Sequence, residues 1–187
     1  MRGAPLIAVL LCAWCGLTAA PAAADTEFYV RRAETHLEEG VYRLDARIQY
    51  RFSEESLEAL RSGVAITIVV GIDVERRRQY LWNQTVASLR QRYQLSHHAL
   101  SARYILTNLN TGISTSYATY EGAVDALGRL DAFPLIDAEL LDPEQDYLVE
   151  LKTYLDIEAL PAPLRPVAYF SSAWRLSSDA FTCPLTP

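Results

Sequence analysis

The chain has 187 residues, a hydrophobic fraction of 50% and a formal net charge of −6 at pH 7. A chain of this length is sufficient for one ordinary domain with its own core. The excess of acidic side chains argues against non-specific nucleic-acid binding, which depends on excess positive charge.

The first residues have the features of an export signal. Arg2 supplies a positive charge, an apolar run extends from Leu6 to Leu17, and three alanines end at Ala24 as a small-residue cleavage site. The apolar run is too short to span a bilayer, which needs roughly 20 residues. We therefore predict a signal peptide over 1–24 and a periplasmic protein without a transmembrane span after cleavage. An uncleaved N-terminal anchor is the alternative.

The remaining chain, 25–187, is expected to form a single β-rich domain. It retains one cysteine, Cys183, so it cannot form an internal disulfide. Cys183 lies near a proline-containing end, and we interpret it as an incidental tail thiol rather than a nucleophile.

The most regular pattern lies between Tyr42 and Val74. Every second residue from Tyr42 to Phe52 is apolar and the residues between are Arg, Asp or Gln, which predicts a half-buried strand. Ser53 can then cap a short helix over 54–62, with two glutamates in its first turn. The same alternation returns from Val64 to Val74 and predicts a second strand.

Weaker patterns predict the other elements. A first strand over 28–37 should pair with the Tyr42 strand through a Glu39-Gly40 turn. Thr119 can cap a second helix over 120–130. Segment 80–87 fits both helical and strand spacing, and the proline-rich segment 160–166 should be a rigid connection. Further strands are predicted over 86–96, 101–108, 113–119, 147–156, 167–170 and 174–177.

These elements predict a β-rich fold, an antiparallel two-layer β-sandwich with two short helices. An open α+β sheet with its helices on one face is the alternative.

The chain contains few groups suited to metal binding or catalysis. Its histidines are His36, His97 and His98, and neither an HExxH motif, a Gly-x-Ser-x-Gly motif nor a phosphate-binding glycine loop occurs after residue 24. We expect no metal, no cofactor and no enzymatic activity.

One basic run is the candidate interaction patch. Arg76, Arg77 and Arg78 follow a strongly apolar strand, and Trp82 comes four residues later. Guanidinium groups are suited to binding carboxylate or phosphate, and an aromatic neighbour can add a cation–π contact. The patch therefore predicts an envelope protein or an acidic ligand as its partner. The competing interpretation is a solvated strand end.

Several stretches along the chain also resemble one known family. They are, in order, Leu57-Glu58-Ala59-Leu60 with Gly63, Arg76 to Arg78, Arg92-Tyr93, Leu155-Asp156, Leu160-Pro161-Ala162-Pro163-Leu164-Arg165 and Trp174-Arg175-Leu176-Ser177. This order resembles the proteobacterial family known as domain of unknown function 4390 over essentially the whole chain after residue 24. The resemblance implies an exported Gram-negative protein and carries over no catalytic residue.

The sequence thus predicts a non-catalytic interaction or accessory module of the cell envelope. A carrier that holds a small apolar ligand or lipid in the tyrosine-rich interior is the alternative. A hydrolase is the least favoured function, and the oligomeric state stays open.

Overall fold

The computed structural model of the chain describes residues 28–78 and 80–186. The predicted signal peptide, 1–24, lies outside these residues. The described part contains nine strands: β1 (Phe28–Glu38), β2 (Val41–Tyr50), β3 (Ile66–Arg76), β4 (Gln84–His98), β5 (Arg103–Asn108), β6 (Ser114–Tyr117), β7 (Arg129–Asp137), β8 (Tyr147–Leu155) and β9 (Phe181–Pro184).

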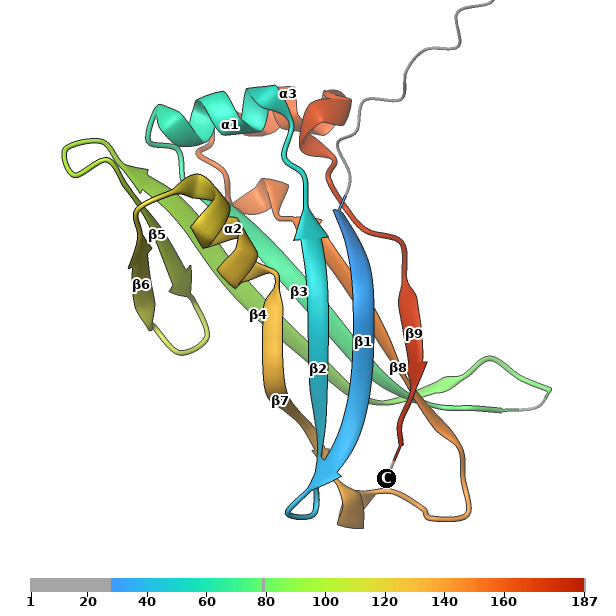
Figure 1. Cartoon of the computed structure of the whole chain (residues 1–187). Helices are drawn as coiled ribbons and strands as arrows, with labels where there is room; N and C mark the ends of the chain where they lie inside the picture. The colour runs from blue at the N-terminus through green and yellow to red at the C-terminus, as the bar shows by residue number, and fades with distance from the viewer. Residues whose placement is uncertain (1–27, 79, 187) are drawn as a thin grey trace, which may run out of the picture.

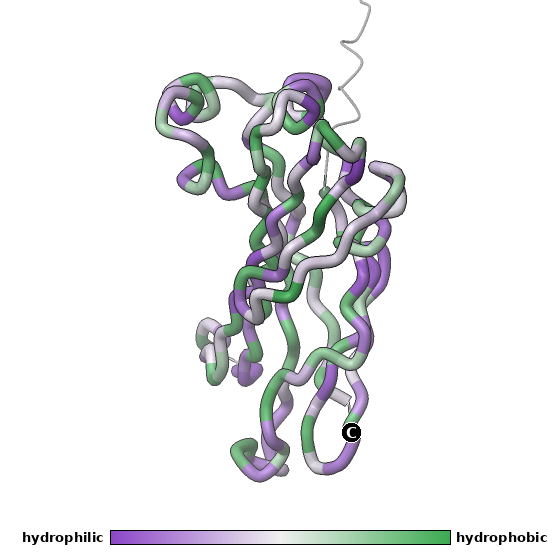
Figure 2. The backbone as a smooth tube through the Cα atoms, turned by 90° about the vertical axis from the view of Figure 1, so that its left-hand side faces the viewer, coloured by the Kyte–Doolittle hydropathy of each residue, from purple (hydrophilic) through white to green (hydrophobic). Residues whose placement is uncertain are grey.

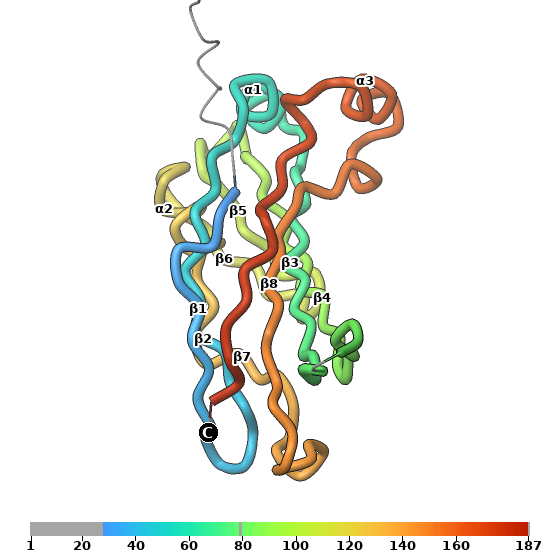
Figure 3. The backbone as a smooth tube through the Cα atoms, turned by 90° about the vertical axis from the view of Figure 1, so that its right-hand side faces the viewer, coloured from blue at the N-terminus to red at the C-terminus, as the bar shows by residue number. Residues whose placement is uncertain are grey.

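The strands form two antiparallel sheets. One has three strands in the order β1-β2-β7, and the other has six in the order β6-β5-β4-β3-β8-β9. Figure 3 shows the two sheets as layers, with β1, β2 and β7 toward the left of the view and β3, β4 and β8 toward the right. The predicted antiparallel two-layer sandwich is confirmed.

The first hairpin shows how the sequence produces this fold. Alternate residues of β2 are buried, among them Leu44, Ala46 and Ile48. Figure 2 shows hydrophilic and hydrophobic residues alternating along the strands. The turn into β2 places Glu39 and Gly40 at positive φ, 51° and 79°, as a tight hairpin connection requires.

β3 is the most deeply buried strand. It lies between β4 and β8, and Ile66, Ile68, Val70, Ile72 and Val74 are fully buried. Their side chains face the three-stranded sheet and form the centre of the hydrophobic core.

Three short α-helices lie on the sandwich. They are α1 (Glu54–Arg61), α2 (Tyr120–Leu127) and α3 (Arg165–Phe170), and 3₁₀ turns η1, η2 and η3 cover Ala138–Leu140, Ile157–Ala159 and Ser172–Trp174. Helices α1 and α3 cover one end of the sandwich (Figure 1). The predicted caps are confirmed, because Ser53 accepts a hydrogen bond from the Ser56 amide and Thr119 accepts one from the Gly122 amide.

The structure corrects the predictions for the C-terminal half. The segment 167–170 is helical rather than extended, since it belongs to α3, whose first turn contains Pro166. The segment 174–177 is not a strand either, because Trp174 lies in η3 and Ser177 makes only an isolated bridge with Tyr154.

Two strands were not predicted. The second helix ends at Leu127 rather than Leu130, and β7 begins at Arg129. The tail forms β9, in which Cys183 is buried and pairs with Val149 of β8. Cys183 is therefore part of the core and not an incidental tail residue.

A hydrogen-bonded contact closes one side of the sandwich. Thr35 of β1 donates its hydroxyl to the Pro184 carbonyl at 2.9 Å and accepts the Thr186 amide at 2.9 Å. The Thr186 hydroxyl donates to the Thr35 carbonyl at 2.8 Å. These bonds join β1, the outer strand of the three-stranded sheet, to the end of β9 in the six-stranded sheet and to the residues after it.

Candidate functional site

The candidate interaction patch lies at the tip of the β3–β4 hairpin. The last residue pair of this hairpin is Arg76 with Gln84, and the tip is taken as residues 76–78 and 80–83. In Figure 1 the hairpin projects beyond the rest of the sandwich as the green arm at the lower right. A long strand pair thus carries the tip away from the body of the protein.

The tip exposes large apolar side chains. Tyr80 is 92% exposed, Leu81 66% and Trp82 91%. Three consecutive side chains of this kind are normally buried, and their joint exposure is typical of a binding surface. The sequence singled out Trp82 but not its two apolar neighbours.

The three predicted arginines do not act as one group. Arg76 and Arg78 both donate from their guanidinium groups to the side-chain oxygen of Gln84, which holds the two cations side by side. Arg77 lines a cavity of about 530 Å³. The separation follows from strand geometry, because neighbouring residues of an extended chain point to opposite faces.

Two further contacts fix the base of the tip. The Asn83 amide donates to Glu75 at 3.1 Å, and the Arg77 backbone N–H donates to the Asp146 carbonyl at 2.8 Å. The second bond anchors the hairpin to the loop before β8.

The predicted aromatic neighbour is present but makes no stacking contact with the arginines. Within residues 28–78 and 80–186 the cation–π contact is that of Arg31 over Tyr29, at 4.9 Å from the ring centre. Trp82 instead shares the tip with the arginines as a separate exposed group.

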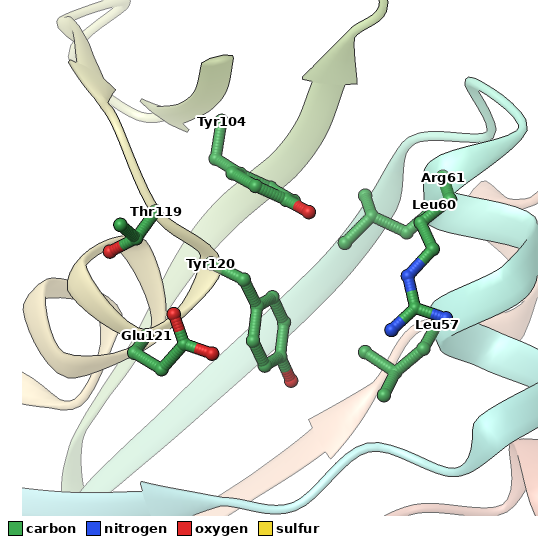
Figure 4. Close-up of a pocket in the computed structure, with 7 residues that line it drawn as sticks. All are labelled: Leu57, Leu60, Arg61, Tyr104, Thr119, Tyr120 and Glu121. Carbon is green, nitrogen blue, oxygen red and sulfur yellow. The ribbon is translucent and has the colours of Figure 1, made fainter. Parts of the chain in front are cut away.

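A smaller cavity lies between α1 and α2. Figure 4 shows Tyr104 and Tyr120 facing Leu57 and Leu60, with Arg61 and Glu121 at its edge. Its volume is about 230 Å³. Burial raises the pKa of the Tyr120 phenol, and the neighbouring Glu121 raises it further, so this hydroxyl stays protonated at neutral pH. The cavity can offer two aromatic rings and one phenolic hydrogen-bond donor or acceptor to a small molecule.

Another cavity bears on the carrier alternative. It measures about 580 Å³ and lies between β2 and α2, where Ile48, Tyr50 and Val124 line it together with charged side chains. The charged members are Arg31, Arg47, Glu121, Asp125 and Arg129. A site for an apolar ligand is lined mostly by apolar groups with a few polar ones, and most of the lining surface of this cavity is apolar despite its charged side chains. The carrier stays an untested prediction.

The histidines have local structural partners. His36 lies 3.1 Å from Asp45, His97 packs against the Tyr104 ring, and His98 contacts the Ser101 hydroxyl at 3.0 Å in the turn after β4. Among residues 28–78 and 80–186 no group of three or more His, Cys, Asp or Glu side chains could hold a metal ion.

These features define a class of protein: an antiparallel β-sandwich from which a hairpin with basic and aromatic side chains projects. The chain belongs to the family described as Domain of unknown function (DUF4390), whose model matches residues 25–184. No curated protein and no solved structure matches the chain.

The stretches that carry the family resemblance have structural roles. Arg92 of β4 donates to Asp156 after β8 at 2.7 Å, and Arg165 donates to the Leu160 carbonyl at 2.8 Å. Trp174 and Leu176 are buried. These contacts hold strands and end segments together, so the resemblance describes the fold.

No helix in the part of the chain that the structure describes is long and apolar enough to cross a membrane.

Proposed function

We propose that this protein is a non-catalytic interaction module of the cell envelope and works in the periplasm. The single observation that carries the proposal is the exposed tip of the β3–β4 hairpin, where Tyr80, Leu81 and Trp82 adjoin three arginines. Exposed apolar side chains of this size lower the solubility of a protein unless a partner covers them.

The export pattern of residues 1–24 supports the periplasmic location. Determination of the N-terminus of the protein recovered from periplasmic extracts tests this part. We expect the chain to start at Asp25, and a chain that begins at Met1 in the cytosolic fraction would contradict it.

Site-specific photocrosslinking tests the interaction itself. A photoreactive amino acid replaces Trp82 in one variant and Phe170 in another, because Phe170 is 90% exposed and belongs to α3 at the opposite end of the fold. We expect envelope components to crosslink at position 82 and not at position 170. Equal crosslinking at both positions would show that the hairpin tip has no special role.

A further inference from the structure

The chemistry of the hairpin tip identifies the kind of partner it fits. We propose that the tip, residues 76–78 and 80–83, docks on the surface of an anionic phospholipid bilayer. This inference rests on the proposed function and names the partner of the same site.

The charge of the tip is opposite to that of the chain as a whole. Residues 76–83 contain three arginines and no acidic residue, whereas the whole chain has a formal net charge of −6. An anionic surface therefore attracts the tip and repels most of the rest of the protein. This asymmetry orients the protein so that the hairpin approaches the surface first.

Two of the arginines are arranged to bind phosphate. Arg76 and Arg78 meet on the side-chain oxygen of Gln84, which is uncharged, so the contact orders the two guanidinium groups without neutralising them. No ion pair joins Arg76, Arg77 or Arg78 to a carboxylate within residues 28–78 and 80–186. Each guanidinium offers a planar set of donors that matches phosphate oxygens.

The apolar side chains are those that favour the boundary between water and lipid. Trp and Tyr concentrate at the headgroup level, because one part of each ring system is apolar and another part donates hydrogen bonds. Leu81 lies between Tyr80 and Trp82 and adds a fully apolar group that can enter the acyl boundary.

The size and shape of the tip favour a bilayer over a protein partner. Three side chains, of which an aromatic one buries roughly 150–250 Å², remove about 500 Å² of the tip's own surface from water. A protein interface of standard size takes about 800 Å² from each partner. A narrow projecting hairpin is also convex (Figure 1), and a bilayer can close around such a wedge without a preformed groove.

Binding to vesicles tests the proposal. The purified protein is sedimented with phosphatidylcholine vesicles that contain or lack phosphatidylglycerol. We expect binding to the anionic vesicles, little binding to the neutral ones, and no competition from inorganic phosphate at millimolar concentration. Equal binding to both vesicle types would overturn the proposal.

Two matched pairs of variants locate the site. The variant Arg76→Gln, Arg77→Gln, Arg78→Gln should bind anionic vesicles at least about tenfold more weakly, since each arginine near an anionic surface adds to the attraction. The variant Arg61→Gln, Arg103→Gln, Arg175→Gln changes the net charge equally at exposed positions elsewhere and should bind like the wild type. Trp82→Ser should weaken binding, whereas Phe170→Ser should not. Unchanged thermal unfolding midpoints establish that each variant is folded.

Tryptophan fluorescence provides a second readout. Trp174 is 6% exposed and Trp82 is 91% exposed. Brominated lipids should therefore quench the fluorescence of Trp82 in the bound protein, and Trp82→Phe should remove this quenching. If position 82 crosslinks to a protein while the wild type ignores anionic vesicles, the partner is a protein and the lipid proposal is wrong, although the proposed function stands. If neither crosslinking nor vesicle binding depends on the tip, both proposals are wrong.

Discussion

The hydroxyl of Tyr50 in β2 lies 3.2 Å from the hydroxyl of Thr153 in β8, so a hydrogen bond joins the two sheets inside the core. Thr153 donates its own hydroxyl hydrogen to the Val69 carbonyl at 3.1 Å. Tyr50 is therefore the donor in the bond between the sheets. Burial raises the pKa of the Tyr50 phenol, so the donor keeps its proton at neutral pH.

Thr153→Val should destabilise the protein by about 1–3 kcal/mol, because it leaves the buried Tyr50 hydroxyl without its acceptor. Tyr50→Phe should cost about 1 kcal/mol, and the double variant should cost less than the sum of the two. Urea unfolding of the four proteins measures this cycle. Additive free energies would mean that the two hydroxyls do not interact.

The cap of α1 gives a second prediction. Ser53 is buried, and its hydroxyl accepts the Ser56 amide at 3.1 Å and contacts the Ser56 hydroxyl at 3.0 Å. Ser53→Ala should lower the free energy of unfolding by roughly 1 kcal/mol or slightly more. Thr119→Ala removes the exposed cap of α2 and serves as the comparison. If Ser53→Ala has the same unfolding midpoint as the wild type, the cap contributes nothing to the stability of the fold.

Gly128 gives a third prediction, because its backbone lies directly against β2. The Ile48 amide donates to the Gly128 carbonyl at 2.8 Å, and a Cβ atom added at Gly128 would lie 2.2 Å from the Ile48 carbonyl oxygen. Gly128→Ala should therefore destabilise the protein by about 1–3 kcal/mol or more.

Gly122→Ala is the matched control inside α2, the helix that Gly128 ends, and there the nearest atom to the added Cβ is the Thr119 hydroxyl oxygen at 3.2 Å. It should change the thermal midpoint much less than Gly128→Ala. Similar midpoints for the two variants would show that α2 moves freely relative to β2.

The exposed face of the larger sheet gives a prediction about pH. Partial burial raises the pKa of Asp73, but the hydrogen bonds from Arg90 and Ser88 outweigh it and hold that pKa below its usual value. A carboxyl group whose pKa is lowered in the folded state stabilises the fold fully when the pH is above its unfolded-state pKa of about 4. This stabilisation is lost as the pH falls through the folded-state pKa.

Asp73→Asn should consequently lose less stability than the wild type when the pH is lowered from neutral to below about 4. Thermal unfolding across this pH range compares the two. Parallel curves would show that the ion pair with Arg90 adds no pH dependence.

Cys183 gives a prediction about reactivity. It is 8% exposed, and burial, followed by the neighbouring Glu34, raises the pKa of its thiol to about 11. Because the thiolate is the reactive form, Cys183 should react slowly with a chromogenic disulfide reagent near neutral pH and rapidly after denaturation. Cys183→Ser should abolish this slow reaction with the reagent. Rapid labelling of the folded protein would mean that β9 opens readily.

The sequence predicted the fold where the local pattern and the burial agree. The alternation through Leu44 and Ile48 and through Ile66 to Val74 located β2 and β3 to within about two residues, because each strand has one clearly apolar face. The failure at 167–170 has a physical cause. A short apolar run fits a strand and a helical turn equally well, and Pro166 favours the start of a helix.

The missed strands have similar causes. Leu130 continued the apolar stripe of α2 in sequence, although Gly128 ends that helix. The candidate site was predicted only in part, since the arginines and Trp82 were identified but the hairpin tip was not. The helix-like spacing in 80–87 obscured three consecutive apolar residues between two strands, which is the signal that could have located the tip.

The contact between Thr35 and Thr186 also constrains the order in which the protein can fold. The two residues are separated by 151 positions, so the sandwich cannot close along this side until almost all of the described chain has been synthesised. The β1–β2 hairpin can form early from local contacts, but the outer edge of β1 stays uncovered until the segment with Thr186 has been synthesised. During that interval the edge is open to non-native strand pairing, and a chaperone that covers β1 would protect the nascent protein.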